Sequence, residues 1–186
     1  SVRRDEVCSR KAEGCALSPA LDAAAPDRIG YDRAFAISSC TELSSATIWS
    51  GLPITASPQA FATAPLLWDY AKARGYRTAY VASQNLLFGQ LGFYLRSSRI
   101  DLLREACDRS AAPPLDLGTD DEISTKEALA FLEAGGPSLV FVHFSNTHNP
   151  YRTVKEIAPF PTAGVSAPER ERNTYRNSVA HNDRVI

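Results

Sequence analysis

Residues 38–53 read Ser38-Ser39-Cys40-Thr41-Glu42-Leu43-Ser44-Ser45-Ala46-Thr47-Ile48-Trp49-Ser50-Gly51-Leu52-Pro53. This stretch is rich in hydroxyl groups, and its closing Gly51 and Pro53 are typical of a helix end. The apolar run Phe35-Ala36-Ile37 directly before it predicts a short strand. We therefore expect a strand, a tight turn that carries Cys40 and Thr41, and then a short helix.

Thr41 is the residue of chemical interest in this arrangement. The first turn of a helix carries unpaired backbone N–H groups and the positive end of the helix dipole, which suit a phosphate or sulfate group. A hydroxyl at this position could attack an anionic ester if a metal ion lowered its pKa. The alternative is that Thr41 or Ser39 serves only as the N-cap of the helix.

The composition is that of a globular protein, and 186 residues suit one domain with a sizeable core. The formal net charge is −1, so nothing indicates a nucleic-acid partner or an anionic membrane surface. No apolar run is long enough to span a bilayer, and no signal-peptide pattern opens the chain. Because the sequence contains no methionine, we expect it to be a processed form or an excised piece.

The four cysteines, Cys8, Cys15, Cys40 and Cys107, form no CxxC pair. This spacing argues against a zinc ribbon or a thioredoxin-like motif. Cys8 and Cys15 could close a small disulfide loop in an oxidising compartment, or they could remain free thiols.

A helix and a strand are predicted after the loop at residues 54–62. Pro65 opens the helix, which runs to Arg74 and stops at Gly75, the expected placement of proline and glycine. Residues 76–82 then read as a strand that leads into Ser83-Gln84-Asn85. Gln84 and Asn85 are candidates to face a substrate, or they are ordinary polar residues of a strand-end turn.

The segment between residues 86 and 134 carries two further expectations. Residues 86–95 are apolar and should pack over one end of the sheet, although exposed aromatic side chains there could contact a substrate. Thr119-Asp120-Asp121-Glu122 predicts the start of a helix that runs to Ala134. For Asp120 and Asp121, helix capping is a better explanation than metal binding.

The clearest strand is Ser138-Leu139-Val140-Phe141-Val142-His143-Phe144, a continuous apolar run typical of a central parallel strand covered on both faces. His143 is expected to be a packed residue of this strand. The strand ends in a polar turn that contains Asn146 and His148, and ligands gather at the carboxyl ends of strands in open α/β sheets. His148 could therefore bind the substrate's anionic group or assist a metal.

The remainder is predicted to be a loop at residues 152–172 and a helix over residues 175–186. His181 and Asp183 lie on this helix and are expected to be mainly structural. Residues 1–32 are predicted to form a surface loop with one short helix.

Three segments in this order, residues 38–53, 65–85 and 138–151, resemble the sulfatase-like branch of the alkaline phosphatase superfamily. This branch includes phosphoethanolamine transferases and lipoteichoic acid synthases, whose nucleophile is a metal-bound threonine. Thr41 lies at the matching position, three residues before Ser44. The resemblance implies a three-layer α/β fold with helices on both faces of the sheet, of which residues 1–186 form an incomplete catalytic domain.

The resemblance also implies a metal site whose remaining ligands lie outside this chain. Ser1–Asp5 is similar to the residues that follow the family's acidic ligand, which is then expected before residue 1. An Asp-His-Gly motif is expected after Ile186. The cofactor is expected to be zinc, or else manganese or calcium, with Thr41 as both metal ligand and catalytic nucleophile.

The implied function is the hydrolysis or transfer of a phosphate or sulfate ester, possible substrates being a lipid or an envelope glycan. The substrate-binding candidates are His148, Asn146, Gln84 and Asn85. The implied location is extracytoplasmic, on the periplasmic side of a membrane-anchored parent, with membrane contact only through a segment outside this chain.

Two further expectations limit this interpretation. A standard sulfatase needs Cys or Ser followed by x-Pro-x-Arg, and Cys40 is followed by neither the proline nor the arginine, so phosphate transfer or hydrolysis through Thr41 fits better. The alternative function is a non-catalytic α/β binding or scaffold domain that kept the fold and lost the metal site.

Overall fold

The computed structural model describes residues 17–24, 27, 35–95, 99–113 and 115–185. Its sheet has three parallel strands in the order β2-β1-β3: β1 is Arg77–Ala82, β2 is Leu102–Arg104 and β3 is Ser138–His143. Ala79 of β1 is in register with Leu102 on one side and Val140 on the other. This register aligns the carboxyl ends of β1 and β3.

Seven α-helices occur in the described part of the chain. They are α1 (Pro19–Ala24), α2 (Thr41–Ser50), α3 (Pro58–Thr63), α4 (Leu67–Ala73), α5 (Leu91–Leu95), α6 (Asp121–Glu133) and α7 (Ala167–Val185). Three short 3-10 turns are η2 (Phe88–Gln90), η3 (Ala106–Asp108) and η4 (Lys155–Ile157).

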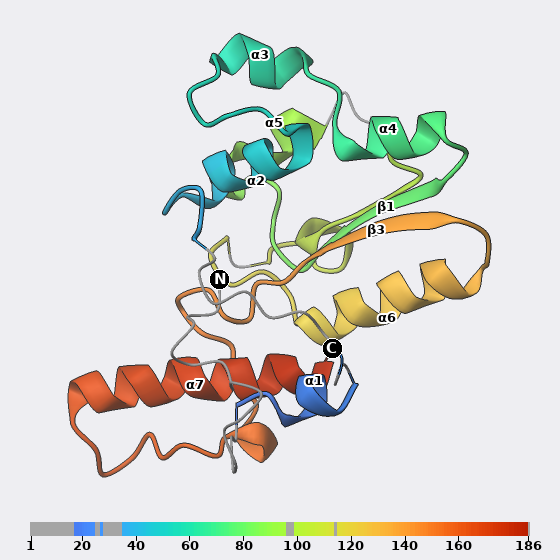
Figure 1. Cartoon of the computed structure of the whole chain (residues 1–186). Helices are drawn as coiled ribbons and strands as arrows, with labels where there is room; N and C mark the ends of the chain where they lie inside the picture. The colour runs from blue at the N-terminus through green and yellow to red at the C-terminus, as the bar shows by residue number, and fades with distance from the viewer. Residues whose placement is uncertain (1–16, 25–26, 28–34, 96–98, 114, 186) are drawn as a thin grey trace.

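The sheet lies between two layers of helices (Figure 1). The helix α6 packs on β1 and β3 from one side, and α4 packs on β1 from the other, where α2 also lies. The long helix α7 lies beyond α6 and contacts it, and α1 packs on α7. The expected three-layer α/β architecture is therefore confirmed.

The main core is aromatic and joins α2 and α4 to the sheet. Trp49, Trp68, Tyr80 and Phe141 contact one another with ring centroids between 5.5 and 6.0 Å apart. The Trp68 indole N–H donates to the Ala79 carbonyl at 3.0 Å, which satisfies the one polar atom of this fully buried ring. These contacts fix the helix that carries Thr41 to the central strand.

Several predicted elements are confirmed to within about two residues, which is the usual uncertainty of an element boundary. They are β1, β3, α4 and α6. The helix α4 begins with the Leu66 N–H donating to the Asp69 carboxylate at 2.7 Å, and Gly75 follows its end with a positive φ of 78°.

The strand predicted at residues 35–37 is wrong. These residues are irregular, and the Phe35 side chain is 88% exposed. An apolar run forms a strand only when a neighbouring strand accepts its backbone hydrogen bonds, and no described strand lies beside it. The prediction that β3 is central is also wrong for the described sheet, because β1 is the middle strand and all six residues of β3 are only half-buried.

Two helices extend into predicted loops. The helix α3 occupies most of the loop expected at residues 54–62 and ends one residue beyond it. It forms there because the Ser57 hydroxyl caps it by accepting the Ala60 N–H at 3.1 Å and Pro58 occupies its first position. The helix α7 begins at Ala167, inside the loop expected at residues 152–172. The expectations for Ser1–Asp5 and for a Cys8–Cys15 disulfide lie outside the described residues.

Candidate functional site

Thr41 is the first residue of α2, as the sequence predicts for a hydroxyl at the helix start. The N-cap position belongs to Cys40, which makes no side-chain capping bond, so neither Thr41 nor Ser39 is the cap. The turn before the helix is held by Ser38, whose hydroxyl accepts the Cys40 N–H at 3.0 Å, and by Ser44, whose hydroxyl donates to the Ser38 carbonyl at 3.1 Å. The backbone around Thr41 is therefore fixed while its own hydroxyl has no bond to another described residue.

Thr41 lines a cavity of about 900 Å³ that the start of α2 shares with the end of β3. From β3 and the turn after it, His143, Phe144 and Thr147 reach the same cavity. Its wall is mixed: serine and threonine hydroxyls lie on the α2 side, and apolar side chains such as Leu17, Phe35 and Val179 lie elsewhere. A strand end and a helix N-terminus thus meet at one hollow, which is the arrangement that an α/β fold offers to an anionic ligand.

His148 lies in the turn after β3, and it does not line this cavity. The backbone N–H of His148 donates to the Ser145 carbonyl at 2.8 Å. The imidazole ring packs edge-on against the Phe88 ring, with the ring centroids 4.9 Å apart. The ring Nδ1 atom is buried and has no hydrogen-bond partner among the described residues. His148 therefore retains an unsatisfied polar atom, and its role in substrate binding stays a prediction.

Gln84 and Asn85 follow β1 and are both buried. The Asn85 side-chain oxygen accepts the Leu87 N–H at 2.8 Å, and the Gln84 side-chain oxygen accepts the Asn85 N–H at 3.2 Å. These bonds stabilise the turn after the strand. Neither residue lines the cavity beside Thr41, so their role as substrate-binding residues also remains a prediction.

Asn146 is fully buried and is surrounded by polar partners. Its side-chain N–H₂ group donates to the Asp120 carboxylate at 3.3 Å and lies 3.4 Å from His181 Nδ1. Its side-chain oxygen accepts the backbone N–H of Asp121 at 3.4 Å. Asn146 thus connects the end of β3 to α6 and α7. Substrate binding by this side chain would compete with these contacts.

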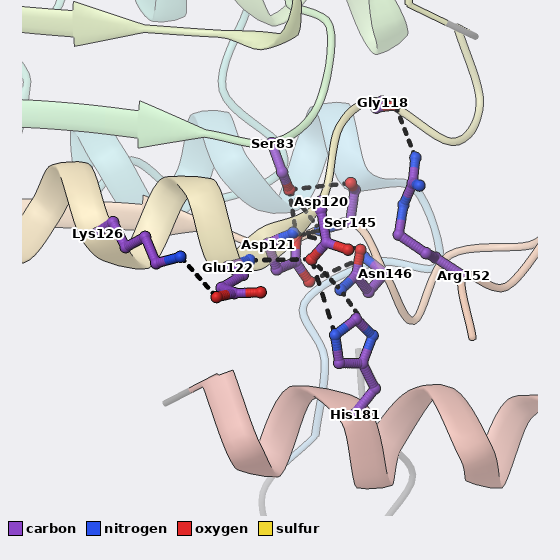
Figure 2. Close-up of polar contacts among 10 residues, drawn as sticks. All are labelled: Ser83, Gly118, Asp120, Asp121, Glu122, Lys126, Ser145, Asn146, Arg152 and His181. Atoms are coloured by element: carbon purple, nitrogen blue, oxygen red, sulfur yellow. Dashed lines mark hydrogen bonds and ion pairs between the residues drawn. The ribbon is translucent and has the colours of Figure 1, made fainter. Parts of the chain in front are cut away.

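A buried carboxylate, Asp121, organises the ends of β1 and β3 (Figure 2). Its Oδ1 atom accepts the Ser145 N–H at 2.8 Å and its Oδ2 atom accepts the Asn146 N–H at 2.9 Å. The Ser83 hydroxyl also donates to Asp121 and lies 2.9 Å from the Ser145 hydroxyl. One side chain at the start of α6 therefore binds both strand ends.

Burial raises the pKa of the Asp121 carboxyl, and the hydrogen bonds from Ser83, Ser145, Asn146 and Asn182 partly offset this effect. The sequence prediction of helix capping is correct for Asp120, whose carboxylate accepts the Glu122 N–H at 3.0 Å. It misses the role of Asp121, because nothing in adjacent acidic residues indicates which of them points into the protein.

Close backbone packing surrounds the same network. Gly118 has a φ of 62°, and a Cβ atom at this position would lie 2.1 Å from the Ser83 carbonyl oxygen. The Thr119 N–H donates to that carbonyl at 2.7 Å. Only glycine fits this approach of the chain to the end of β1.

His143, the last residue of β3, is hydrogen-bonded through Nδ1 to the Tyr80 hydroxyl at 2.9 Å. Burial lowers the pKa of His143 to about 4, and burial also raises the pKa of Tyr80. At neutral pH both groups are therefore uncharged, and the imidazole Nδ1 atom accepts a hydrogen bond from the tyrosine hydroxyl. His143 thus packs against Tyr80, as expected, but it is only half-buried and also lines the cavity beside Thr41.

Asp183 and His181 of α7 both contact other elements, and Asp183 also lines the cavity beside Thr41, so their mainly structural role stays a prediction. The Asp183 carboxylate accepts the N–H groups of Ala20 and Leu21 at 2.7 and 2.9 Å and so holds α1. His181 is 3% exposed and faces Asn146 and Asp120.

The described residues do not fit a complete metal site. No group of three or more His, Cys, Asp and Glu side chains converges in the described part of the chain. Thr41 is a single neutral donor, and tight sites use about four ligands held in fixed geometry. Likewise, no described helix is both long enough and apolar enough to cross a membrane.

The sulfatase family model matches residues 8–186, so the chain belongs to the sulfatase family. A comparison with curated proteins finds no match. Among solved structures, the chain is similar to the lipoteichoic acid synthase LtaP from Listeria monocytogenes, with a TM-score of 0.72 and 14% identity, over 94% of this chain and 45% of that one.

Two other solved structures are similar. The C-terminal periplasmic domain of EcEptC from Escherichia coli, in complex with zinc, gives a TM-score of 0.70 and 18% identity over 100% of this chain and 54% of that one. A protein of the alkaline phosphatase superfamily from Vibrio parahaemolyticus gives a TM-score of 0.62 and 17% identity, over 90% of this chain and 43% of that one. The chain has the alkaline phosphatase-like fold and spans about half of the length of these structures.

Proposed function

We propose that this chain is part of a metal-dependent enzyme that hydrolyses or transfers a phosphate or sulfate ester through Thr41. The observation that carries the proposal is the position of Thr41, the first residue of α2, on the wall of the cavity at the end of β3. Membership of the sulfatase family supports the reaction class.

The first turn of α2 supplies the groups that such a reaction needs from the protein. Its backbone N–H groups and the helix dipole favour the negative charge of the ester, and the hydroxyl of Thr41 is placed beside them. In the first step the Thr41 oxygen forms a bond to phosphorus or sulfur, the bond to the leaving oxygen breaks, and the Thr41 proton passes through solvent to the departing alkoxide. In the second step water or an acceptor alcohol attacks the same phosphorus or sulfur, the bond to the Thr41 oxygen breaks, and the proton of the attacking hydroxyl returns to Thr41.

Zinc, manganese or calcium is the proposed cofactor, and Thr41 is the proposed ligand from this chain. The zinc complex of EcEptC supports this choice of ion. The other ligands are proposed to lie outside the described ranges, because the resemblance to the family leads us to expect an acidic residue before Ser1 and an Asp-His-Gly motif after Ile186.

The proposed substrate is an anionic ester of a lipid or envelope glycan, and the proposed location is extracytoplasmic. One similar structure is named for the synthesis of lipoteichoic acid, and another is a periplasmic domain. His148, Asn146, Gln84 and Asn85 are proposed to contact the substrate at the strand ends.

The test is Thr41→Ala in the intact protein that contains this chain, supplied with zinc or manganese. The probes are bis-p-nitrophenyl phosphate and p-nitrophenyl sulfate. We expect the wild type to cleave one of them, and the variant to lose several orders of magnitude in kcat with a nearly unchanged Tm. Full activity in Thr41→Ala, or no activity in the wild type, would refute the proposal and favour a non-catalytic domain.

A further inference from the structure

The carboxylate of Asp121 is a conspicuous buried group that the reaction at Thr41 does not use. It is 0% exposed, and both of its oxygens accept hydrogen bonds from the turn after β3. A carboxylate that accepts several backbone N–H groups is held firmly, and it holds those groups in return.

The partners of Asp121 belong to two different strand ends. Ser145 and Asn146 follow β3, and Ser83 follows β1. Gln84 and Asn85 come directly after Ser83, and His148 comes two residues after Asn146. The four proposed substrate-binding residues do not line the cavity beside Thr41. Phe144 and Thr147, which flank Ser145 and Asn146, do line it, so Asp121 holds a turn that forms part of the cavity wall.

The nucleophile is outside this network. Thr41 lies on α2, on the other side of the sheet from α6, and no hydrogen bond joins Thr41 to Asp121 or to its partners in the described part of the chain (Figure 1). A change at Asp121 should then move the substrate-binding turns and leave the first turn of α2 in place.

We propose that Asp121 is a positioning residue, which aligns the turns after β1 and β3 so that their side chains can bind the substrate. This inference rests on the proposed function of Thr41. On this proposal, the Asp121 carboxylate and the Ser83 hydroxyl hold the turns after β1 and β3 in the positions that substrate binding requires.

The variant Asp121→Asn keeps the size of the side chain and replaces one acceptor oxygen with an N–H₂ donor. That donor would face one of the backbone N–H groups of Ser145 and Asn146, so at least one of the two bonds is lost. The variant Ser83→Ala leaves both backbone bonds to Asp121 in place and removes the contacts of the Ser83 hydroxyl with Asp121, with Ser145 and with the His143 carbonyl. Its effect should be smaller, because the Ser145 N–H keeps its bond to Asp121.

The experiment compares kcat and KM of the intact metal-loaded protein with bis-p-nitrophenyl phosphate and p-nitrophenyl sulfate. We expect Asp121→Asn to raise KM about tenfold or more while kcat changes less, because substrate binding is lost and the nucleophile is not. Hydrogen–deuterium exchange should show faster exchange at the amides of Ser145 and Asn146. The matched control is Ala128→Gly, which weakens the same helix at a buried position away from the strand ends.

The outcomes separate this inference from the proposed function. If Asp121→Asn and Ala128→Gly lower the Tm similarly and neither changes KM, Asp121 is only structural and the inference is overturned. If Asp121→Asn changes KM and Thr41→Ala abolishes turnover, both proposals stand. If Thr41→Ala is fully active, the proposed function fails whatever Asp121 does.

Discussion

Trp49 of α2 and Tyr80 of β1 pack edge to face, with their ring centroids 5.5 Å apart and their planes at 86°. Both rings are fully buried, and Phe141 of β3 contacts both of them. Trp49 lies two turns along the helix from Thr41. This contact therefore anchors the helix of the proposed nucleophile to the sheet that carries the rest of the site.

Replacing Trp49 should cost the protein much of its stability. Trp49→Ala would leave a large cavity in the aromatic core, and we expect the free energy of unfolding to fall by about 3–5 kcal/mol. Urea denaturation measures this loss. The neighbouring Ile48 is 54% exposed, so Ile48→Ala should change stability by about 0.5 kcal/mol or less. Equal losses in the two variants would contradict the packing of α2 described above.

Gly118 should not tolerate a side chain. In Gly118→Ala the new methyl group would lie 2.1 Å from the Ser83 carbonyl, so the backbone would have to move. Gly135→Ala is the control, because Gly135 also has a positive φ, 80°, but has open space where the methyl would go. We expect Gly135→Ala to lower the free energy of unfolding by about 1–2 kcal/mol, which is the cost of a positive φ for alanine. Gly118→Ala should lower it by clearly more, because the steric clash is added. Thermal unfolding of both variants provides the comparison.

The stability of the protein should fall in mildly acidic solution because of His143. Its folded-state pKa of about 4 lies below the ordinary value of 6.5, so between these pH values the unfolded state binds more protons than the folded state. The contribution of neutral His143 is therefore fully present above about pH 6.5 and is lost as the pH falls toward 4.

The comparison of wild type with His143→Gln isolates this effect. Asp121 has a raised pKa and so contributes an opposite slope, but it is present in both proteins. We expect the difference in Tm between the two proteins to shrink as the pH is lowered from 7 to 4.5. A difference that is constant over this range would show that His143 titrates normally in the folded state.

His148 and His143 should respond differently to the same substitution. His148→Ala removes a half-buried ring whose Nδ1 has no partner among the described residues, so we expect a loss of turnover in the intact protein with a small change in Tm. His143→Ala removes the partner of the Tyr80 hydroxyl and should mainly lower the Tm. Activity and thermal unfolding are measured for both variants. A loss of turnover in His143→Ala together with a loss of stability in His148→Ala would mean that the roles of the two histidines are wrongly assigned.

The sequence by itself determined the elements whose signals are local. Glycine and proline mark the ends of α4, the continuous apolar run marks β3, and the acidic start at residues 119–122 marks α6. The position of Thr41 at the first turn of a helix could also be predicted, because the stop at Gly51 and Pro53 fixes the segment before it. The helix α3 could have been predicted from Ser57 and Pro58, a capping residue followed by the proline of a first turn.

Only the tertiary structure decided which residues meet. Residues 35–37 have the composition of a strand, yet they form none, since a strand requires a neighbour that accepts its hydrogen bonds. Asp120 and Asp121 are adjacent and chemically identical, and only the packing of α6 against the strand ends turns one toward its own helix and buries the other among the N–H groups of Ser145 and Asn146. Burial and hydrogen bonding depend on groups far away in the chain, and a single sequence does not show which of these groups come together.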